Sequence, residues 1–296
     1  MARIETDPGS AFRALLVLVG LAVSVLLAAI FLSLLLFSRP ALLNNGLRFI
    51  TGTEWNPVTG RFQALAFVAG TLLASFIALA IATVLSFALA ILLGYYFRTG
   101  VLASVMKTAV ELLAGIPSVV YGFIGLFFLV PVVRTLQRVL GMPPYGVSIL
   151  TASILLAFMI LPYSASIGRE MISLVPEDLK EAALSLGATP SEVVRKVSLP
   201  YARSGILGGV LLALGRALGE TMAVTMVVGN SYNLTLNVLS PGNTMASLIA
   251  NEFSEATGEV YLASLIEIAL LLFLVSTAIN ILGKLVIKRT SAAARL

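Results

Sequence analysis

Residues 181–200 read Glu-Ala-Ala-Leu-Ser-Leu-Gly-Ala-Thr-Pro-Ser-Glu-Val-Val-Arg-Lys-Val-Ser-Leu-Pro. This stretch belongs to a polar segment, residues 169–204, which holds five basic and five acidic residues and lies between two long apolar segments. Glycine and proline interrupt the segment, so the pattern predicts two short helices joined by a sharp turn. A polar elbow between segments that are apolar enough to enter a bilayer is the feature that decides the class of fold.

The signals for the turn fall on particular residues. Gly187 can adopt the left-handed conformation that ends the first short helix. Thr189 and Glu192 form a Thr-x-x-Glu capping box at the start of the second helix, and Pro190 occupies its first helical position. Pro200 is expected to stop this second helix.

The first short helix also carries a surface that suits a partner. Ala182 and Ala183 are small, so another protein can approach the helix closely at these positions. Glu181 can accept hydrogen bonds from donors on that partner.

The composition places the chain in a bilayer. Its 296 residues are 59% hydrophobic and only 11% charged, whereas roughly a quarter of a soluble domain is charged. The chain has no cysteine and no histidine, which excludes disulfides, Cys/His metal sites and triads that use histidine. It also lacks the Gly-x-x-x-x-Gly-Lys-Ser/Thr pattern of a phosphate-binding loop. We therefore expect no enzyme activity, no catalytic residue, and no metal or cofactor on this chain.

Six segments are long and apolar enough to cross a membrane, which requires about 20 residues. They are residues 15–37, a single tilted helix within 62–97, 112–133, about 147–168, about 205–229 and about 260–286. The sequence thus predicts an all-α membrane protein with six transmembrane helices. Proline interrupts two of the spans, at Pro117 and Pro162, and kinks are expected there.

The basic residues predict the orientation, because they are enriched in cytoplasmic segments. With the N-terminus inside, thirteen Lys and Arg residues fall on the cytoplasmic side and five on the outside. Both termini and the elbow are therefore expected in the cytoplasm. The net charge of +5 reflects this topology, and nucleic acid is not expected as a partner.

The fifth predicted span contains two charged residues, Arg216 and Glu220. Arg216 lies about eleven residues, or roughly 16 Å, from the inner end, near the midplane of a ~30 Å hydrocarbon core. Charges at that depth are costly unless they are paired or face water, and they mark function by default. Glu220 follows four residues later, so the two side chains share a helix face and can form an ion pair.

These two residues suggest an anionic substrate. The guanidinium fork of Arg216 suits an oxyanion. A nearby carboxylate would repel a fully deprotonated anion but would accept a hydrogen bond from hydrogen phosphate, so the pair matches phosphate better than sulfate. Two other roles stay open: Glu220 only holds Arg216, or the pair only neutralises itself and locks helix packing.

The sequence also resembles a known family. The spacing in 181–200 is similar to that of the cytoplasmic loop that import-type ABC transporter permeases present to their ATPase: Glu-Ala-Ala, three residues, Gly, nine residues, an aliphatic residue, one more, Leu-Pro. Residues 208–225, Gly-Gly-Val-Leu-Leu-Ala-Leu-Gly-Arg-Ala-Leu-Gly-Glu-Thr-Met-Ala-Val-Thr, resemble the PstC-type permease of bacterial and archaeal phosphate ABC importers. Residues 114–123 and 241–251 do so too, and the resemblance covers roughly residues 60–290.

The resemblance implies a type I ABC importer permease fold in the cell membrane. A permease domain at 61–290 would contain the coupling loop 169–204. It would be preceded by the cytoplasmic N-terminus, first helix and outer loop at 1–60, and followed by a cytoplasmic tail at 291–296. The chain would move inorganic phosphate inward by alternating access.

The same resemblance implies partners and site residues. The partners are a second, PstA-type permease, a PstB-type ATPase dimer that binds ATP and Mg²⁺, and an extracytoplasmic PstS-type phosphate-binding protein. Glu181, Ala182, Ala183 and Gly187 would couple the chain to the ATPase. The substrate-pathway residues would be Arg216, Glu220 and Thr221.

Two alternatives stay open at the level of sequence. One is an ABC permease for another oxyanion, such as sulfate or molybdate. The other, from a different class, is an ion-coupled secondary transporter, which would not need an elbow of this length and spacing and for which an inverted repeat would be expected.

Overall fold

The computed structural model describes residues 8–292 and consists almost entirely of helices. Within this range, six helices are long and apolar enough to cross a membrane. They are Phe12–Phe37, Leu65–Tyr96, Ser118–Val139, Ile149–Ser173, Pro190–Leu218 and Glu259–Arg289. The prediction of an all-α protein with six spans is therefore confirmed. The predicted tail, 291–296, lies outside the described residues except for 291 and 292, as do the first seven residues of the chain.

The centre of the bundle is α8 (Ile149–Ser173), which packs against α4 (Leu65–Ile91) and α11 (Leu199–Leu218). One stripe of buried residues on α4 repeats every fourth residue and carries only small side chains. Its members are Gly70, Ala74, Ala78, Ala82, Ser86 and Ala90. A Cβ atom on Gly168 of α8 would lie 2.9 Å from the Cβ of Ala90. Small residues thus bring the two backbones close together, as is typical of membrane helices.

The second predicted span is confirmed as one continuous helix, because α4 runs directly into a π-helical turn, η1 (Leu92–Tyr96). The third differs from the prediction. It is divided into α5 (Val101–Gly115) and α6 (Ser118–Ile124). Ile116 is extended, with φ −70° and ψ 127°, because a following proline disfavours the helical conformation. By contrast, α8 continues through Pro162 without interruption.

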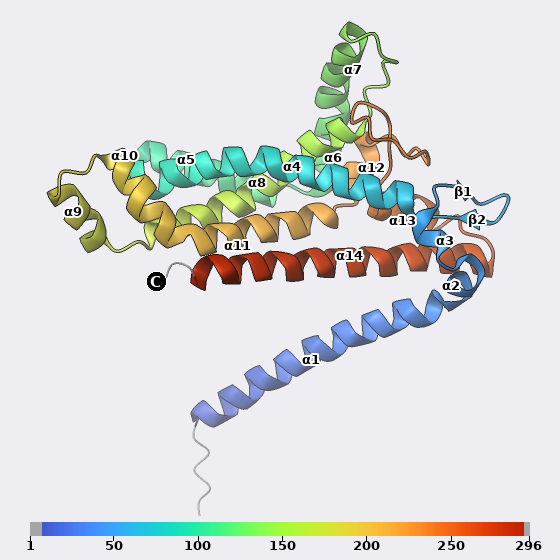
Figure 1. Cartoon of the computed structure of the whole chain (residues 1–296), viewed down its shortest axis with the longest axis horizontal. Helices are drawn as coiled ribbons and strands as arrows, with labels where there is room; N and C mark the ends of the chain where they lie inside the picture. Colours follow the sequence, from blue (N-terminus) through green and yellow to red (C-terminus); the bar gives the residue numbers. More distant parts are fainter. Residues whose placement is uncertain (1–7, 293–296) are drawn as a thin grey trace, which may run out of the picture.

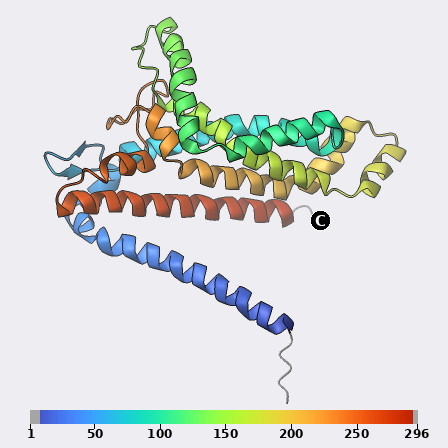
Figure 2. The same cartoon turned by 180° about the vertical axis from the view of Figure 1, so that it is seen from behind.

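Beyond α6 the chain leaves the bundle. A second π-helical segment, η2 (Gly125–Leu129), leads into α7 (Val130–Val139), and Figures 1 and 2 show α7 projecting away from the other helices. Gln137 fixes this helix to the neighbouring loops. Its side-chain amide donates to the carbonyl oxygen of Leu239 (2.7 Å) and accepts from the N–H of Gly146 (2.7 Å). The predicted bounds 112–133 for the third span were therefore wrong at both ends.

Short elements gather at the end of the bundle opposite α9 and α10 (Figure 1). They are α2 (Arg39–Asn45), α3 (Arg48–Thr51), the antiparallel strands β1 (Trp55–Asn56) and β2 (Arg61–Phe62), and α13 (Met245–Glu252). The Trp55 indole and the Tyr261 hydroxyl both donate to one carboxylate oxygen of Glu252, at 2.8 and 2.7 Å. This buried carboxylate therefore joins the hairpin, α13 and α14 (Glu259–Ala292).

The first helix, α1 (Pro8–Phe37), diverges from the bundle (Figure 1). Its described side chains are largely apolar and exposed within this chain. The rings of Phe31 and Phe273 touch, with centroids 5.6 Å apart, which places its C-terminal part beside α14. A single apolar helix with this exposure requires lipid or another subunit around it.

The topology can be tested with single cysteines, since the natural chain has none. We expect Ser191→Cys to react with an impermeant maleimide only from the cytoplasmic side, and Val58→Cys and Leu236→Cys only from the outside. All three positions are exposed, and the distribution of basic residues sets their sides. The parent chain should show no labelling. Reaction of Ser191→Cys and Leu236→Cys from the same side of intact vesicles would contradict the orientation.

Candidate functional site

The elbow consists of α9 (Glu177–Ser185), α10 (Pro190–Val193) and the turn between them, and it lies at one end of the bundle (Figure 1). Gly187 has φ +86°, as the sequence predicted. Its N–H donates to the carbonyl oxygen of Leu184 (2.9 Å), and the N–H of Ala188 donates to that of Ala183 (3.1 Å). This is the hydrogen-bond pattern of a glycine-ended helix.

The capping box at the start of α10 is also confirmed. The hydroxyl oxygen of Thr189 accepts from the N–H of Glu192 (3.4 Å), and the Glu192 carboxylate accepts from the N–H of Thr189 (3.0 Å). The prediction that Pro200 stops this helix was wrong. The chain continues through a π-helical turn, η3 (Val194–Ser198), into α11, and Pro200 lies in the first turn of α11. A proline is tolerated at such a junction, where the regular hydrogen-bond pattern is already interrupted.

The outward face of the elbow is exposed and partly apolar. Glu181 and Ala182 are exposed and Ala183 is partly exposed. Leu186 is 89% exposed, and Leu184, two residues earlier, is 44% exposed. The turn of the elbow therefore presents two large apolar side chains beside Glu181 and Ala182.

The second candidate site lies where the fifth predicted span is broken. The sequence predicted a continuous helix over 205–229, but α11 ends at Leu218, and a separate helix, α12 (Met222–Val227), begins after Thr221. Gly219 is the C-terminal cap of α11, with φ −97° and ψ 0°. Glu220 therefore lies between the two helices and not on a continuous helix face with Arg216.

The break gives both charges a favourable place. Arg216 lies in the last turn of α11, where the helix dipole favours a cation. Glu220 lies just before α12, and its carboxylate accepts from the N–H of Ala223 (3.4 Å). The guanidinium Nη2 of Arg216 and Oε2 of Glu220 are 4.0 Å apart. The side chain of Arg216 is 39% exposed and that of Glu220 only 9%, so the cation is the more accessible of the two.

Arg216 faces a hollow of about 610 Å³ between helices α8, α11 and α14. It is lined by Tyr163, Leu212, Gly215, Arg216, Gly219, Glu220 and Asn280. The Arg216 guanidinium carbon lies 5.0 Å from the centroid of the Tyr163 ring, a cation–π contact. Asn280 donates through its side-chain amide to the carbonyl oxygen of Ser276 (2.9 Å). The hollow thus combines one accessible cation, an aromatic face and an amide.

Sequence reasoning missed two residues of this hollow, Tyr163 and Asn280. Both are polar residues within predicted spans, and that was the available signal, but only packing brings α8 and α14 to α11. Thr221, by contrast, is not among the lining residues. Its hydroxyl donates to the carbonyl oxygen of Gly219 (3.2 Å), within the break itself. Glu267, a second acidic residue within a predicted span, is buried elsewhere in α14.

Comparison with known proteins defines the class of this molecule. Residues 86–292 match the family described as binding-protein-dependent transport system inner membrane component. The chain belongs to this family, and it is a multi-pass membrane protein of an ABC import system. The solved structures of the MetNI methionine ABC transporter in inward-facing conformations share its fold. One of them superposes with a TM-score of 0.60 at 17% identity, over 80% of this chain and 99% of that one.

The curated relatives are closer in sequence. A protein of Mesorhizobium japonicum, named phosphate transport system permease protein PstC, is 43% identical over 91% of this chain and 87% of its own length. A protein of Xylella fastidiosa with the same name is 42% identical over 95% of this chain and 90% of its own length. The probable PstC of Methanocaldococcus jannaschii is 41% identical over 60% of this chain. Family membership excludes the ion-coupled secondary transporter and confirms the type I ABC importer permease fold.

The turn of the elbow can be tested through Gly187. A Cβ atom at this position would have open space around it, so Gly187→Ala introduces only the cost of a positive φ, about 1 kcal/mol. We expect the amide of Ala188 to exchange with deuterium about fivefold faster. Gly208→Ala is the matched control, because a Cβ there also meets nothing within 4 Å and its φ is not positive. Equal exchange in wild type and Gly187→Ala would contradict the role of the glycine.

Proposed function

We propose that this chain is the PstC-type permease subunit of an ATP-driven phosphate importer. The observation that carries the substrate class is the accessible guanidinium of Arg216 in a hollow of an otherwise apolar helix bundle. A planar fork of N–H donors suits an oxyanion. The relatives named as phosphate transport permeases support phosphate over the other oxyanions.

The geometry supports different roles for the two charged residues. Arg216 is accessible and would donate to the anion, with its guanidinium over the ring of Tyr163. Glu220 is nearly buried, and its two carboxylate oxygens face Arg216 and the N–H of Ala223. This favours the role in which Glu220 positions Arg216. The hydroxyl of hydrogen phosphate could instead donate a hydrogen bond to the amide oxygen of Asn280, whose NH₂ group already donates to the carbonyl oxygen of Ser276.

The elbow is proposed as the surface that binds the ATPase. Glu181, Ala182 and Ala183 stand on the outward face of α9, and Gly187 sets the turn that follows. ATP and Mg²⁺ would be bound by a PstB-type ATPase dimer. A PstA-type permease would complete the transmembrane pathway, and a PstS-type protein would deliver phosphate from outside. ATP binding would move the elbow and open the hollow to alternate sides of the membrane, with both termini of this chain in the cytoplasm.

The test of the substrate site is competitive uptake by the complete complex in liposomes. We expect Arg216→Ala to lower uptake of labelled phosphate by roughly a hundredfold or more, because the anion loses its charged hydrogen-bond donor. Arg216→Lys should recover little, since an ammonium lacks the planar fork. Wild-type uptake by Arg216→Ala would remove this residue from the substrate path.

Glu220→Gln in the same assay separates the two roles of the carboxylate. If Glu220 positions Arg216, uptake falls while the preference for phosphate over sulfate and molybdate stays as in wild type. A weaker preference for phosphate would show instead that the carboxylate recognises the proton of the substrate. Efficient sulfate or molybdate uptake by the wild type, without phosphate uptake, would overturn the proposed substrate.

A further prediction concerns the ring of Tyr163. Tyr163→Leu removes the ring beneath the guanidinium, and a cation–π contact is worth about 1 kcal/mol at an exposed site and up to about 2 kcal/mol when it is desolvated. We expect phosphate uptake to fall about five- to tenfold. Tyr163→Phe is the matched control, because it keeps the ring and removes only the hydroxyl, and it should transport at close to the wild-type rate. Equal losses in both variants would assign the effect to the hydroxyl.

A further inference from the structure

Within the elbow, α10 buries the apolar side chain of Val193, whereas α9 is attached through polar contacts. Of the residues Glu177–Ser185, all of which the structure describes, Lys180 alone is buried, at 4% exposure. Its amine lies 3.3 Å from Oε1 of Glu177 and 6.0 Å from the ring centroid of Tyr95, in the π-helical turn η1 that follows α4. A buried ammonium requires such partners. The position of α9 therefore depends on how Lys180 and Glu177 are held.

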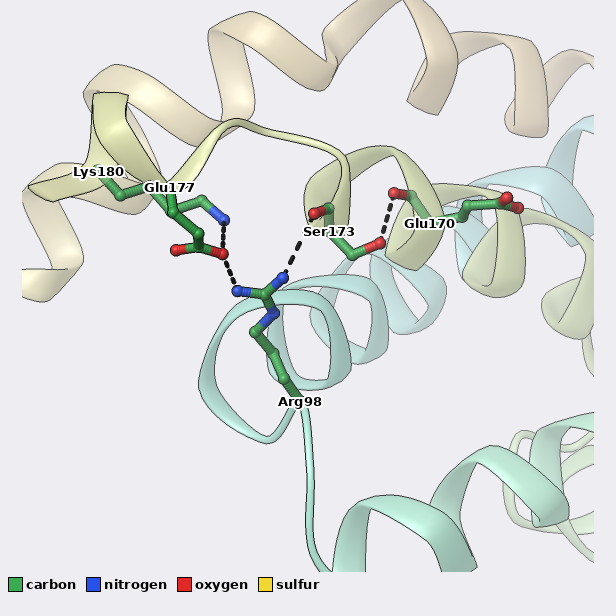
Figure 3. Close-up of polar contacts among 5 residues, drawn as sticks. All are labelled: Arg98, Glu170, Ser173, Glu177 and Lys180. Atoms are coloured by element: carbon green, nitrogen blue, oxygen red, sulfur yellow. Dashed lines mark hydrogen bonds and ion pairs between the residues drawn. The ribbon is translucent and has the colours of Figure 1, made fainter.

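Glu177 joins α9 to a second element. The same oxygen, Oε1, forms an ion pair with Nη1 of Arg98, which lies in the linker between η1 and α5 (Figure 3). The other amino group of Arg98 donates to the carbonyl oxygen of Ser173 at the end of α8 (3.4 Å). One carboxylate oxygen thus holds a cation of its own helix and a cation of the linker, and Figure 3 shows the three side chains converging. We call Arg98, Glu177 and Lys180 the clamp.

The linker is in turn attached to α5. The amine of Lys107, two turns into α5, donates to the carbonyl oxygen of Arg98 (2.8 Å). The helix α5 leads across Ile116 and Pro117 into α6, and α6 packs against α12. At their contact, a Cβ atom on Gly122 would overlap the sulfur of Met226, at 2.3 Å. A continuous series of contacts therefore connects α9 to α12, which begins immediately after Glu220 and Thr221.

We propose that Glu177 is a positioning residue for energy coupling, which transmits movement of α9 through Arg98 into α5 and α6. This route would act beside the covalent one through α10, η3 and α11. It rests on membership of the ABC importer family and not on the identity of the substrate.

The clamp has the properties that such a joint needs. The side chains of Arg98 and Glu177 are 40% and 52% exposed, and ion pairs of this exposure are individually weak, so the joint can open and close within one transport cycle. Glu177 nevertheless stays ionised at neutral pH. Its hydrogen bond from Arg98, and to a smaller extent that from Lys180, holds the pKa of its carboxyl below the ordinary value.

The test compares Glu177→Gln with Asp178→Asn in the complete complex. Both substitutions remove one negative charge from the first turn of α9, but among the described residues Asp178 has no ion pair within 4.0 Å. We expect Glu177→Gln to bind the ATPase and hydrolyse ATP normally and to transport about five- to tenfold less phosphate per ATP. Asp178→Asn should couple as the wild type does. If Glu177→Gln transports as much phosphate per ATP hydrolysed as the wild type, the proposal is wrong. Loss of ATPase binding would also overturn it, because it would place Glu177 in the contact surface.

A double-mutant cycle tests the pair itself. Arg98→Gln should lower the ratio as Glu177→Gln does, and the two together should lower it no further, because both remove the same contact. Additive losses would show that the residues act separately and would overturn the proposal.

A readout that does not depend on the substrate separates this inference from the proposed function. A cysteine introduced at Leu212 in the hollow, in an otherwise cysteine-free chain, should change its rate of labelling when ATP is added. We expect Glu177→Gln to lose most of this change while ATP hydrolysis continues. Suppose that the wild type takes up no phosphate but still changes its labelling rate with ATP, and that Glu177→Gln does not change its labelling rate. The substrate assignment then fails, while the proposed role of Glu177 stands. If ATP changes the labelling rate in Glu177→Gln as much as in the wild type, the proposed role of Glu177 is wrong.

Discussion

A helix that ends inside an apolar bundle frees backbone groups that have no water to bond, and the end of α11 at Leu218 creates this requirement beside the candidate substrate site. The residues of the break meet it locally. The hydroxyl of Thr221 donates to the carbonyl oxygen of Gly219, and the hydroxyl of Thr225 donates to that of Thr221 (2.8 Å). The Glu220 carboxylate accepts from the N–H of Ala223 in the first turn of α12. These bonds satisfy part of the polar groups that the break frees, and the break places an arginine at a helix end that faces a hollow.

The break in α11–α12 also has a counterpart. The third predicted span is divided at Ile116 and Pro117, and the short helix after that break, α6, packs on the short helix after the other, α12. The two short helices form a unit that is joined to α5 and α11 through non-helical residues. By contrast, small residues bring α4, α8 and α11 close together, since a Cβ on Gly168 would lie 2.9 Å from Ala90 and one on Gly209 would lie 3.0 Å from Ile167. The structure therefore separates a closely packed scaffold from a smaller pair of helices beside the hollow.

Local chemistry explains which features could be predicted from the sequence. The capping box at Thr189 and the turn at Gly187 involve neighbours within five residues, so residue type and spacing determine them. The break after Leu218 could not be predicted, because glycines such as Gly219 are common within continuous membrane helices. Pro117 and Pro162 both predicted a kink within a span. The helix is divided before Pro117, whereas α8 continues through Pro162.

Contacts between distant segments were beyond sequence reasoning. The ring of Tyr163 reaches Arg216 only because α8 packs on α11. Lys180 was counted among the basic residues of a solvated segment, but its amine is buried against Glu177 and Tyr95. In both cases the residue type was visible and its partner was not, since the partner is chosen by tertiary packing.

The elbow and the hollow are connected at the break between α11 and α12. The covalent route from the elbow runs through η3 and α11 and ends at Arg216, whereas the route through the clamp runs through α5 and α6 and ends at α12, directly after Glu220. A movement of the elbow that displaces the two routes by different amounts must change the separation of Arg216 and Glu220, now 4.0 Å. A shorter separation occupies the guanidinium with the carboxylate, and a longer one frees it for an anion. The ion pair is therefore the point at which a movement of α9 would change the affinity of the hollow, without any large displacement of the scaffold.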